Sequence, residues 1–428
     1  MRNVLMLTYH FPPSAASGSF RLMGFARHLP SHGWRSTVVA PPSLPWEPVD
    51  PALCDRLPAG TVVCPVPYPS RKVIRKFAPL SGWLPGAWRA CKRVVRNDRP
   101  DAILTSGPPQ QVHWLGLMLK KRYNIPWLAD FRDPWYPEGR MNRGEGFARW
   151  NVERQEAAVF AAADAVIANA PGACAALRAD YPRHRQKFVT LPNGYDRESF
   201  AGAEGPPPTG GRPLKLVHTG AIYVGRDPRP VFDAMRNLSS SGRASLCAEF
   251  FGPKPESDLD LAAEITMRGL QGRVVLHGQV TYARCLDAIT SADIVLLMDT
   301  PGRTVGVPAK LYEYLGAGRP ILALGESNGD LAWVLSRSGV PYRIAPPGDP
   351  LAVTSALGEL AREASAYHDP SPRVDLHRFS REAIAGRLAA VLDRCTGATA
   401  GPGDADDDSG DLAAIHEPSD EAITVEGS

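Results

Sequence analysis

A lysine and a glutamate three residues apart stand where the chain passes from a loop into a short predicted helix. Lys310 and Glu313 are followed by a Gly318-Arg319-Pro320 turn and an apolar strand. Residues at this spacing share one helix face, and free N–H groups at a helix start favour an anion. Lys310 can strengthen such an anion site, and Glu313 can accept hydrogen bonds from two vicinal hydroxyls. A diphosphate beside a ribose meets both demands, so the pair predicts a nucleotide-sugar site; the alternative is an exposed ion pair on a solvated helix.

A second group of candidates follows a predicted strand in the first half of the chain. Asp130, Arg132 and Asp133 come at its carboxyl end, which in parallel sheets is the end that faces ligands. Asp133 could accept a proton from an acceptor hydroxyl or orient it, with Asp130 and Arg132 beside the acceptor. The alternative is a loop ion pair of Arg132 with either aspartate, which would cap the following segment.

Two further candidates follow the first predicted strand. His10 could line the same cleft, although a lone histidine there is as often structural. Gly18 could present N–H groups to a sugar or phosphate at a helix start, or it could simply form a tight turn. His218 and His277 end strands in the second half, where packing alone would explain them.

The elements that must position these residues alternate between strands and helices. The first half predicts strands at 3–8, 36–40, 102–107, 127–130, 165–168 and 188–191, with helices at 19–31, 111–122 and 145–162. The second half predicts strands at 214–218, 248–251, 274–277, 294–297 and 321–324, with a helix at 228–240. This alternation indicates doubly wound parallel sheets. No Gly-X-Gly-X-X-Gly follows the first strand, which argues against a nicotinamide dehydrogenase.

The chain length and a Pro/Gly-rich stretch divide the protein. A chain of 428 residues is too long for one ordinary core, and residues 202–211 read as a linker. We therefore expect an α/β domain over 1–200 and another over 212–378. A last helix is expected over 379–395, and one possible arrangement is that it crosses back to the first domain. An acidic, disordered tail is expected over 396–428.

Charge is unevenly distributed. The formal net charge is +3, but nine of the 45 acidic residues lie within 400–428, which has no Lys or Arg. The remaining body therefore has 36 acidic residues against 48 Lys and Arg, a net charge of +12. Such a body suits a phosphorylated substrate or an anionic membrane surface. Nucleic acid has no supporting motif, so none is expected as a partner.

Several classes of protein are disfavoured. The seven cysteines are scattered without a Cys-X-X-Cys or Cys/His cluster, so neither zinc nor a disulfide framework is expected. The apolar start ends at Tyr9-His10, too soon for a signal peptide. No run of about 20 apolar residues predicts a transmembrane helix. These features favour a cytoplasmic enzyme or binding protein.

Residues 71–99 combine basic and aromatic side chains. The basic residues are Arg71, Lys72, Arg75, Lys76, Arg89, Lys92, Arg93 and Arg96, interleaved with Phe77, Trp83, Leu84 and Trp88. Such a segment could dock on anionic lipid headgroups, giving peripheral contact with the inner face of a membrane. Alternatively, it is a basic helix whose aromatic residues pack into the first domain.

Six short motifs occur in a characteristic order at predicted strand ends. They are Phe11-Pro12-Pro13 with Gly18, residues 105–109, Asp130 to Trp135, Ala163-Asp164 with 192–196, His218-Thr219-Gly220 and the 310–320 block. Together they resemble retaining glycosyltransferases of family 4, over nearly the whole chain before the acidic tail. The resemblance implies the GT-B architecture, in which two Rossmann-like doubly wound domains face a cleft.

The resemblance also implies which residues act. The second domain would hold a nucleoside-diphosphate sugar, with Glu313 on the ribose and with Gly220, Val307 and Pro308 beside the donor. The first glutamate of the family's Glu-X7-Glu pattern would stand at 305, where this chain has Val305. The family's Gly-Arg is Gly220-Ala221 here, and the nearest later cation is Arg226.

The diphosphate is assigned to Arg226 and Lys310, since arginine can make a bidentate contact. Fixed cations stabilise the charge that develops on a departing diphosphate, so no metal or other cofactor is expected. Asp404-Ala405-Asp406 spells a metal-binding Asp-X-Asp, but within the acidic tail we interpret it as a chance match.

The resulting expectation is a hexosyltransferase that acts on a lipid-linked or polysaccharide acceptor in cell-surface glycan synthesis. One alternative is a sugar-nucleotide epimerase on the same fold, which needs no acceptor. Another is a non-catalytic nucleotide-sugar-binding protein, for which Val305 is the best argument.

Overall fold

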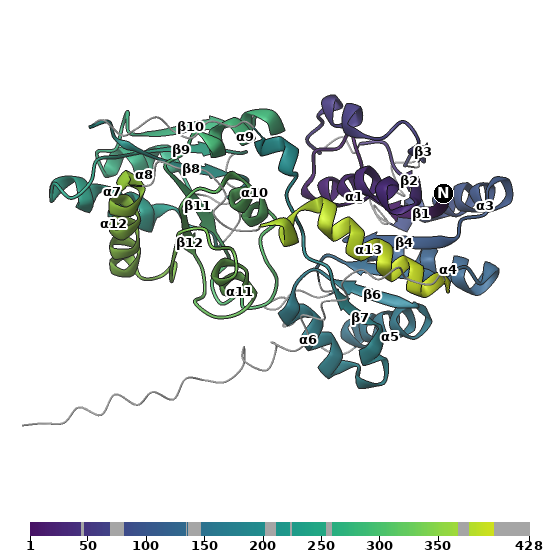
Figure 1. Cartoon of the computed structure of the whole chain (residues 1–428). Coiled ribbons are helices and arrows are strands. Elements are labelled where there is room, and N and C mark those ends of the chain that lie inside the picture. Colours follow the sequence, from purple (N-terminus) through teal and green to yellow (C-terminus); the bar gives the residue numbers. More distant parts are fainter. Residues whose placement is uncertain are drawn as a thin grey trace, which may run out of the picture.

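The structure is a computed structural model, and it describes residues 1–43, 47–68, 81–133, 135, 147–201, 211–222, 225–253, 259–366 and 376–397. In that part of the chain, two α/β domains lie side by side (Figure 1). The predicted linker at 202–210, the basic residues 71–80 and the acidic segment 398–428 lie outside the described residues.

A seven-stranded parallel sheet forms the centre of the first domain, in the order β3-β2-β1-β4-β5-β6-β7. Its strands are β1 (Arg2–Thr8), β2 (Trp34–Ala40), β3 (Val62–Pro65), β4 (Ala102–Gly107), β5 (Trp127–Phe131), β6 (Ala165–Ala168) and β7 (Phe188–Thr190). Its helices are α1 (Ser17–His28), α3 (Leu84–Asn97), α4 (His113–Tyr123), α5 (Phe147–Ala162) and α6 (Pro171–Asp180). Central strands such as β1 are continuous apolar runs because helices cover both faces of the sheet.

The second domain contains a six-stranded parallel sheet in the order β10-β9-β8-β11-β12-β13. Its strands are β8 (Leu214–Thr219), β9 (Leu246–Phe251), β10 (Val274–Gly278), β11 (Ile294–Met298), β12 (Ile321–Leu324) and β13 (Tyr342–Ala345). Its helices are α7 (Arg229–Ser240), α8 (Leu261–Met267), α9 (Tyr282–Thr290), α10 (Lys310–Ala317), α11 (Asp330–Ser336) and α12 (Pro350–Ala366). Both sheets reverse their strand order next to the first strand, so both domains are doubly wound. The predicted fold class is confirmed.

Short 3-10 helices connect several of these elements. They are η1 (Leu29–His32), η2 (Pro51–Arg56), η3 (Ser81–Trp83), η4 (Gln110–Val112), η6 (Pro182–Lys187), η7 (Arg197–Phe200) and η8 (His377–Phe379). The helix predicted over 19–31 therefore begins earlier, at Ser17, and ends at His28, where η1 takes over before the left-handed Gly33.

The last helix, α13 (Arg381–Thr396), packs against the first domain although it follows the second in sequence (Figure 1). Ser380 caps its start by accepting a hydrogen bond from the Ala383 N–H at 3.1 Å. Leu388 and Leu392 join the core cluster that contains Val4 and Phe25. The chain therefore crosses between the domains twice, and the second crossing delivers the start of α13 to the boundary between them.

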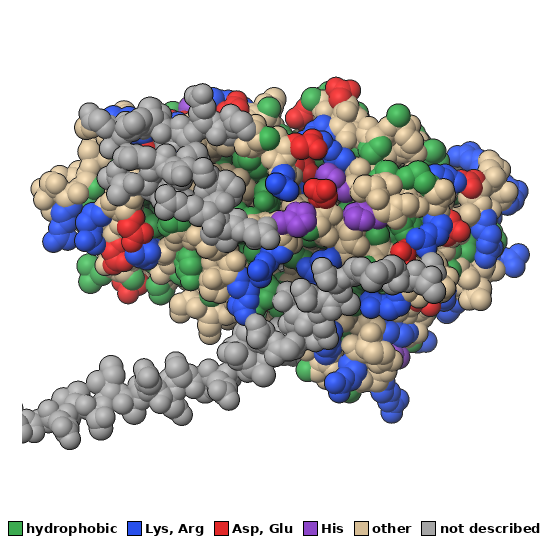
Figure 2. Space-filling view, in the orientation of Figure 1, with side chains coloured by type: hydrophobic (Ala, Val, Ile, Leu, Met, Phe, Trp, Pro, Cys, Tyr) green, Lys and Arg blue, Asp and Glu red, His purple; other side chains and the backbone are tan. Residues whose placement is uncertain are grey.

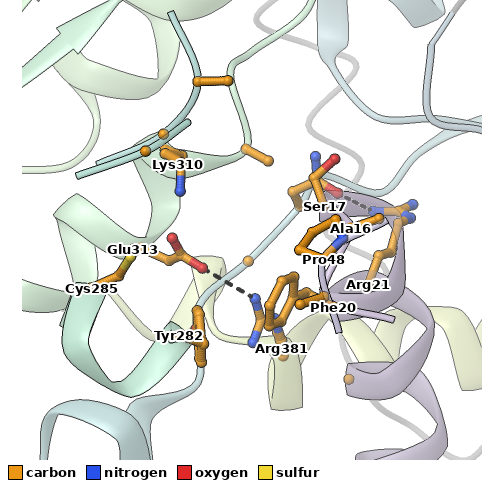
Figure 3. A pocket seen from close by; sticks show the side chains of 18 of the residues that line it. Ala16, Ser17, Phe20, Arg21, Pro48, Tyr282, Cys285, Lys310, Glu313 and Arg381 are labelled. Atoms are coloured by element: carbon orange, nitrogen blue, oxygen red, sulfur yellow. Dashed lines mark hydrogen bonds and ion pairs between the residues drawn. The ribbon is translucent and has the colours of Figure 1, made fainter. Parts of the chain in front are cut away.

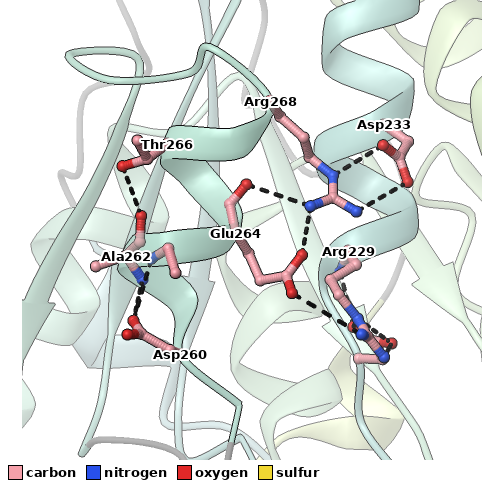
Figure 4. Close-up of polar contacts among 9 residues, drawn as sticks. Arg229, Asp233, Asp260, Ala262, Glu264, Thr266 and Arg268 are labelled. Carbon is pink, nitrogen blue, oxygen red and sulfur yellow. Dashed lines mark hydrogen bonds and ion pairs between the residues drawn. The ribbon is translucent and has the colours of Figure 1, made fainter.

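A network of ion pairs joins α7 and α8 at the far side of the second domain (Figure 4). Arg268 donates to Asp233 of α7 at 2.8 Å and also pairs with Glu264 one helical turn before it. Asp260 caps α8 through the N–H groups of Ala262 and Ala263. This network stabilises the outer face of the domain and lies apart from the site described below.

Edge elements are where the sequence-based assignment was incomplete. No bounds were predicted for strands β3 and β13 or for helices such as α6, α11 and α12. β3 is an exposed edge strand and β13 is only half-buried, so neither strand forms a continuous apolar run that could be recognised. No helix in the described ranges is long and apolar enough to span a membrane.

Candidate functional site

A cavity of about 580 Å³ lies where the two domains meet (Figure 3). The first domain contributes Ala16, Ser17, Phe20 and Arg21, at the start of α1. The second domain contributes Gly220, Gln279, Tyr282, Lys310 and Glu313, and α13 contributes Arg381. Among the residues that the structure describes, three cationic side chains and one carboxylate line the cavity, a charge balance that favours an anionic ligand.

The start of α10 brings Lys310 and Glu313 into this cavity together. Figure 3 shows both side chains pointing into the same space from one helix face. Ala309, the residue before the helix, makes no side-chain cap, and the N–H groups of Leu311 and Tyr312 donate to the carbonyls of Pro308 and Ala309. The structure therefore combines a helix N-terminus, a cation and a carboxylate in one cavity.

Gly220 leaves room for the lysine. It follows β8 with a φ of 133°, and a Cβ built there would lie 2.5 Å from Cε of Lys310. A larger residue would therefore push the lysine away from the end of β8, and its own backbone would be strained. The end of β8 and the side chain of Lys310 therefore lie in close contact at the cavity.

Arg381 links the two domains at the cavity. One of its nitrogens lies 3.9 Å from Glu313, and another donates to Asp196 at 2.6 Å. Arg27, His28 and Arg56 also surround the buried Asp196 carboxylate. Burial opposes its ionisation, but these groups, Arg381 foremost, hold the pKa of Asp196 well below its usual value. Asp196 therefore anchors Arg381 as a permanent cation beside Glu313.

The first domain is shaped to admit Arg381. A Cβ on Gly24 would lie 2.7 Å from Cδ of Arg381, so only glycine fits on this face of α1. Beside it, the rings of Phe20 and Tyr282 pack across the domain boundary, with 4.5 Å between their centroids. Burial raises the pKa of the Tyr282 hydroxyl, with the Glu313 charge as a further cause, so Tyr282 stays neutral.

Asp130 acts on the cavity through Arg21. The two side chains form a bidentate pair with both distances at 2.9 Å, and Ser106 donates to the same carboxylate at 2.7 Å. Arg21 also donates to the backbone carbonyls of Leu191 and Pro192. Asp130 is fully buried and does not line the cavity, so its predicted place beside the acceptor is corrected: it holds Arg21 in position.

Three other residues predicted for the first-domain side of the site do not line the cavity. Arg132 is buried and donates to the carbonyls of Gly107 and Pro108, and its guanidinium covers Gly18. Gly18 is thereby shielded, and the residues just before it, Ala16 and Ser17, line the cavity instead. Asp133 lies in the loop after β5, where it is exposed and does not line the cavity. Its backbone carbonyl accepts a hydrogen bond from the side-chain amide of Gln110 at 2.7 Å.

His10 forms a pair behind the cavity wall. Its Nδ1 lies 2.6 Å from a Glu47 oxygen, and Ser14 donates to the other oxygen of Glu47 at 2.8 Å. The neighbouring Pro48 lines the cavity, whereas His10 and Glu47 do not. His10 therefore lies near the cavity without lining it, and its partner Glu47 directly precedes the lining residue Pro48.

Arg226 lies next to the cavity, not in its lining. Its guanidinium lies 3.8 Å from the buried carboxylate of Asp299, which Arg303 also approaches at 3.2 Å. Arg226 and Lys310 both act on His218, whose pKa falls to about 4, mainly through burial and further through these two charges. The two predicted diphosphate cations therefore flank the same strand end, with Lys310 inside the cavity and Arg226 behind it.

The loop before α10 is held by Asp330, a residue that the sequence did not single out. Its carboxylate accepts from the N–H of Gly306 at 2.7 Å and from the N–H of Gly172 in the first domain at 2.6 Å. Val307 and Pro308, the predicted donor contacts, are buried residues of this loop and do not line the cavity. Asp330 thus ties the loop to the start of α6 across the domain boundary.

His277 and His218 pack as expected of structural residues. His277 stacks on Phe251 at 4.2 Å and lies 3.1 Å from Glu249, away from the cavity. His218 donates a hydrogen bond from Nδ1–H to the Leu296 carbonyl at 2.9 Å. No three His, Cys, Asp or Glu side chains converge as a metal site would require in the portion of the chain that the structure describes.

The comparison with known families decides the class of protein. Residues 19–194 match the family described as a glycosyl transferase 4-like domain. The first domain is a glycosyltransferase domain. The match covers α1 to the end of the first sheet, including the Arg21–Asp130 pair that supports the cavity wall. A search of curated proteins found no match to this chain.

Solved structures show the GT-B fold. HepE from Anabaena, in complex with UDP and glucose, is 18% identical over 92% of this chain and 100% of its own, with a TM-score of 0.61. Sucrose-phosphate synthase from Thermosynechococcus elongatus is 18% identical over 93% of this chain and 100% of its own, also at 0.61. A putative UDP-N-acetylglucosamine 2-epimerase from Listeria monocytogenes is 12% identical, covers 94% and 98%, and has a TM-score of 0.58.

Sequence reasoning missed most of the residues that pack around Glu313 or hold the loop before α10. Arg381, Tyr282 and Asp330 each stand at a helix start, far from Glu313 along the chain. Asp196 was part of a recognised motif, but only its buried cluster of cations reveals what it does. The one signal in the sequence that could have found these residues is their position at predicted helix starts, because parallel α/β units bring ligand-facing residues to strand ends and helix starts.

Proposed function

We propose that this glycosyltransferase moves a sugar from a nucleoside-diphosphate sugar to a lipid-linked or polysaccharide acceptor, with retention of anomeric configuration. The observation that carries the proposal is the presence of Lys310 and Glu313 together in the cavity between the domains. Their shared helix face suits one ligand that carries both a diphosphate and a ribose.

In this proposal the diphosphate lies over Gly220, against Lys310 and the positive end of the α10 dipole. Glu313 accepts hydrogen bonds from the ribose hydroxyls, and Arg381 keeps the Glu313 carboxylate oriented from 3.9 Å away. The acceptor enters against the first-domain wall formed by Ser17, Phe20 and Arg21. The donor-side contacts come from the second domain, so the sugar would sit between the two walls.

Charge governs the proposed reaction. Breaking the anomeric C–O bond sends its electron pair to the diphosphate, while the acceptor oxygen forms the new bond to the same carbon and its proton passes to an oxygen of the departing diphosphate. A fixed cation aimed at the leaving oxygen typically contributes about 2.7–4 kcal/mol to such a step. Lys310 is placed for this role, with Arg226 adding a more distant positive charge. We propose that these protein cations act without a metal ion, and full activity in a metal chelator would support this.

UDP-sugars are the first donors to test, because HepE of Anabaena was solved with UDP-glucose and with UDP. A thermal-shift screen against nucleoside diphosphates and their sugars should show selective stabilisation by one base. The anomeric configuration of the product, read by NMR, tests retention. An inverted product, or no stabilisation by any nucleotide, would contradict the proposal.

Epimerisation of a sugar nucleotide is the second candidate, since a putative 2-epimerase shares the fold. The two functions separate in one experiment without acceptor. An epimerase converts the sugar nucleotide alone, whereas a transferase leaves it intact or hydrolyses it slowly.

We further propose peripheral contact between the first domain and an anionic membrane. Trp83 is buried and donates to the Val66 carbonyl at 2.8 Å, and Leu84 is buried too, so these apolar side chains pack into the core. The exposed face of α3 is basic. In the described residues, therefore, the contact would be electrostatic, and binding to vesicles that contain anionic lipid should fall steeply with added salt.

A further inference from the structure

A second cavity, of about 680 Å³, lies against α3 in the first domain. Four cations of this helix line it, at the spacing i, i+3, i+4 and i+7 that places them on one face: Arg89, Lys92, Arg93 and Arg96. Pro65, Pro67 and Tyr123 complete the wall of what we call the α3 groove. Figure 2 shows Lys and Arg side chains gathered over α3 and α4 at this end of the molecule.

The charges of the α3 groove are not balanced locally. Nearby cations have partners: Arg35 pairs with Asp98, and Lys120 pairs with Asp164 at 2.8 Å. In the ranges that the structure describes, no ion pair involves any of the four groove cations. Like charges held on one helix face repel each other, so an anionic partner in this groove would be favoured.

The chain itself carries a partner of opposite charge. Residues 404–426 contain nine acidic residues and no Lys or Arg. This segment follows α13, which ends at the edge of the first sheet where β1 and β2 begin: Asp393 accepts a hydrogen bond from the indole N–H of Trp34 at 2.8 Å and pairs with Arg2.

The reach of the chain permits the contact. Asp404 follows Gly397 by seven residues, which span up to about 23 Å when extended. The acidic segment adds 23 residues of its own, so it is long enough to extend from the sheet face that α13 covers, past the edge of the sheet, to the α3 groove on the other face.

We propose that the acidic segment 404–426 binds in the α3 groove of its own chain. The segment then covers the basic surface that would otherwise meet anionic lipid, so it competes with that surface's other partners. This inference goes beyond the donor site and does not depend on the identity of the sugar nucleotide.

Carbodiimide cross-linking of the full chain tests the contact, because it joins a carboxylate directly to a lysine within ion-pair distance. Lys92 is the lysine that lines the α3 groove, and Lys121 of α4 is exposed beside it as a matched control. No Lys or Arg follows Arg394, so trypsin releases 395–428 as a single peptide. We expect cross-links from this peptide to Lys92 to exceed those to Lys121 several-fold, and to fall several-fold at about 1 M salt, where the Debye length is about 3 Å.

A triple variant separates attraction by the groove from chance proximity. Arg89→Gln, Arg93→Gln and Arg96→Gln together leave Lys92 in place and remove three exposed charges, so the yield at Lys92 should fall several-fold. An unchanged yield would overturn the proposal, as would equal labelling of Lys92 and Lys121. Mixing isotope-labelled and unlabelled chains adds a further test: cross-links between the two would place the segment on a second copy and would also overturn it. None of these readouts involves nucleotide, so their failure leaves the proposed function untouched.

Discussion

The guanidinium of Arg381 stands 3.9 Å from the carboxylate of Glu313, although the first belongs to a helix packed on one domain and the second to a helix of the other. Asp196 fixes the arginine from behind at 2.6 Å. The carboxylate proposed to hold ribose is therefore oriented from across the domain boundary. Donor binding and the relative placement of the domains should be coupled through this contact.

Removing the charge of Glu313 should weaken nucleotide binding. Glu313→Gln keeps the shape of the side chain but loses a charged acceptor worth about 1.5–3 kcal/mol, so the Kd for the cognate nucleoside diphosphate should rise about 10- to 100-fold. Isothermal titration calorimetry measures this. Glu363→Gln, on the exposed side of α12, is the matched control and should bind normally. Equal affinity in both variants would remove Glu313 from the donor site.

Arg381 should affect both stability and binding. Arg381→Gln leaves buried Asp196 without its nearest cation, which can cost up to about 3–5 kcal/mol of unfolding free energy in urea denaturation. Arg381→Lys should recover part of that loss. Nucleotide affinity should also fall, but less in a Glu313→Gln background, with a coupling of about 0.5–3 kcal/mol in the double-mutant cycle. Strict additivity would mean that Arg381 only supports the fold.

Lys310 should matter more for turnover than for folding. Lys310→Met removes the cation proposed to stabilise the departing diphosphate, so kcat should drop about 10²- to 10³-fold. Thermal unfolding should change little, since Lys310 is only half-buried. Lys121→Met, on the exposed surface of α4, controls for loss of a positive charge. Normal turnover in the Lys310 variant would refute the proposed charge mechanism.

Asp330 should position the loop before α10. Asp330→Asn replaces an acceptor of two N–H groups by a side chain that can meet only one of them, at a cost of about 1.5–3 kcal/mol for the lost charged hydrogen bond. Stability should fall, and the Kd for nucleotide should rise as the loop loosens. A loss of stability with unchanged Kd would indicate a tie between the domains and nothing more.

Acid should destabilise the fold through two buried histidines. Burial lowers the pKa of His113 to about 3, with Arg132 as a further cause, and the pKa of His218 to about 4. Both are neutral in the folded state above these values, whereas the unfolded chain takes up protons below about 6.5. The unfolded state therefore binds more protons as pH falls from about 6.5 towards 4, and stability is lost in that window.

His218→Asn tests the acid prediction, because an asparagine amide can replace Nδ1 opposite the Leu296 carbonyl. The variant should lose about 2 kcal/mol less than the wild type between pH 7 and pH 5 in urea denaturation. Parallel pH profiles for the two proteins would show that His218 does not titrate with unfolding.

Local patterns in the sequence determined the class of fold and the centre of the candidate site. Alternating apolar runs and helical segments specify parallel α/β units, because hydrophobic periodicity is a property of neighbouring residues. The spacing of Lys310 and Glu313 specifies a shared helix face for the same reason. Both features depend on residues a few positions apart, which a single sequence displays.

Tertiary structure alone decided which distant residues meet that centre. Arg381 reaches Glu313 only because α13 folds back on the first domain, and Asp330 meets Gly172 only because the domains adjoin. The same long-range packing turns Asp130 inward to Arg21 and leaves Asp133 exposed. These contacts join residues that are 68 to 158 positions apart, so they depend on how whole sheets and helices pack, and no local period in the sequence predicts them.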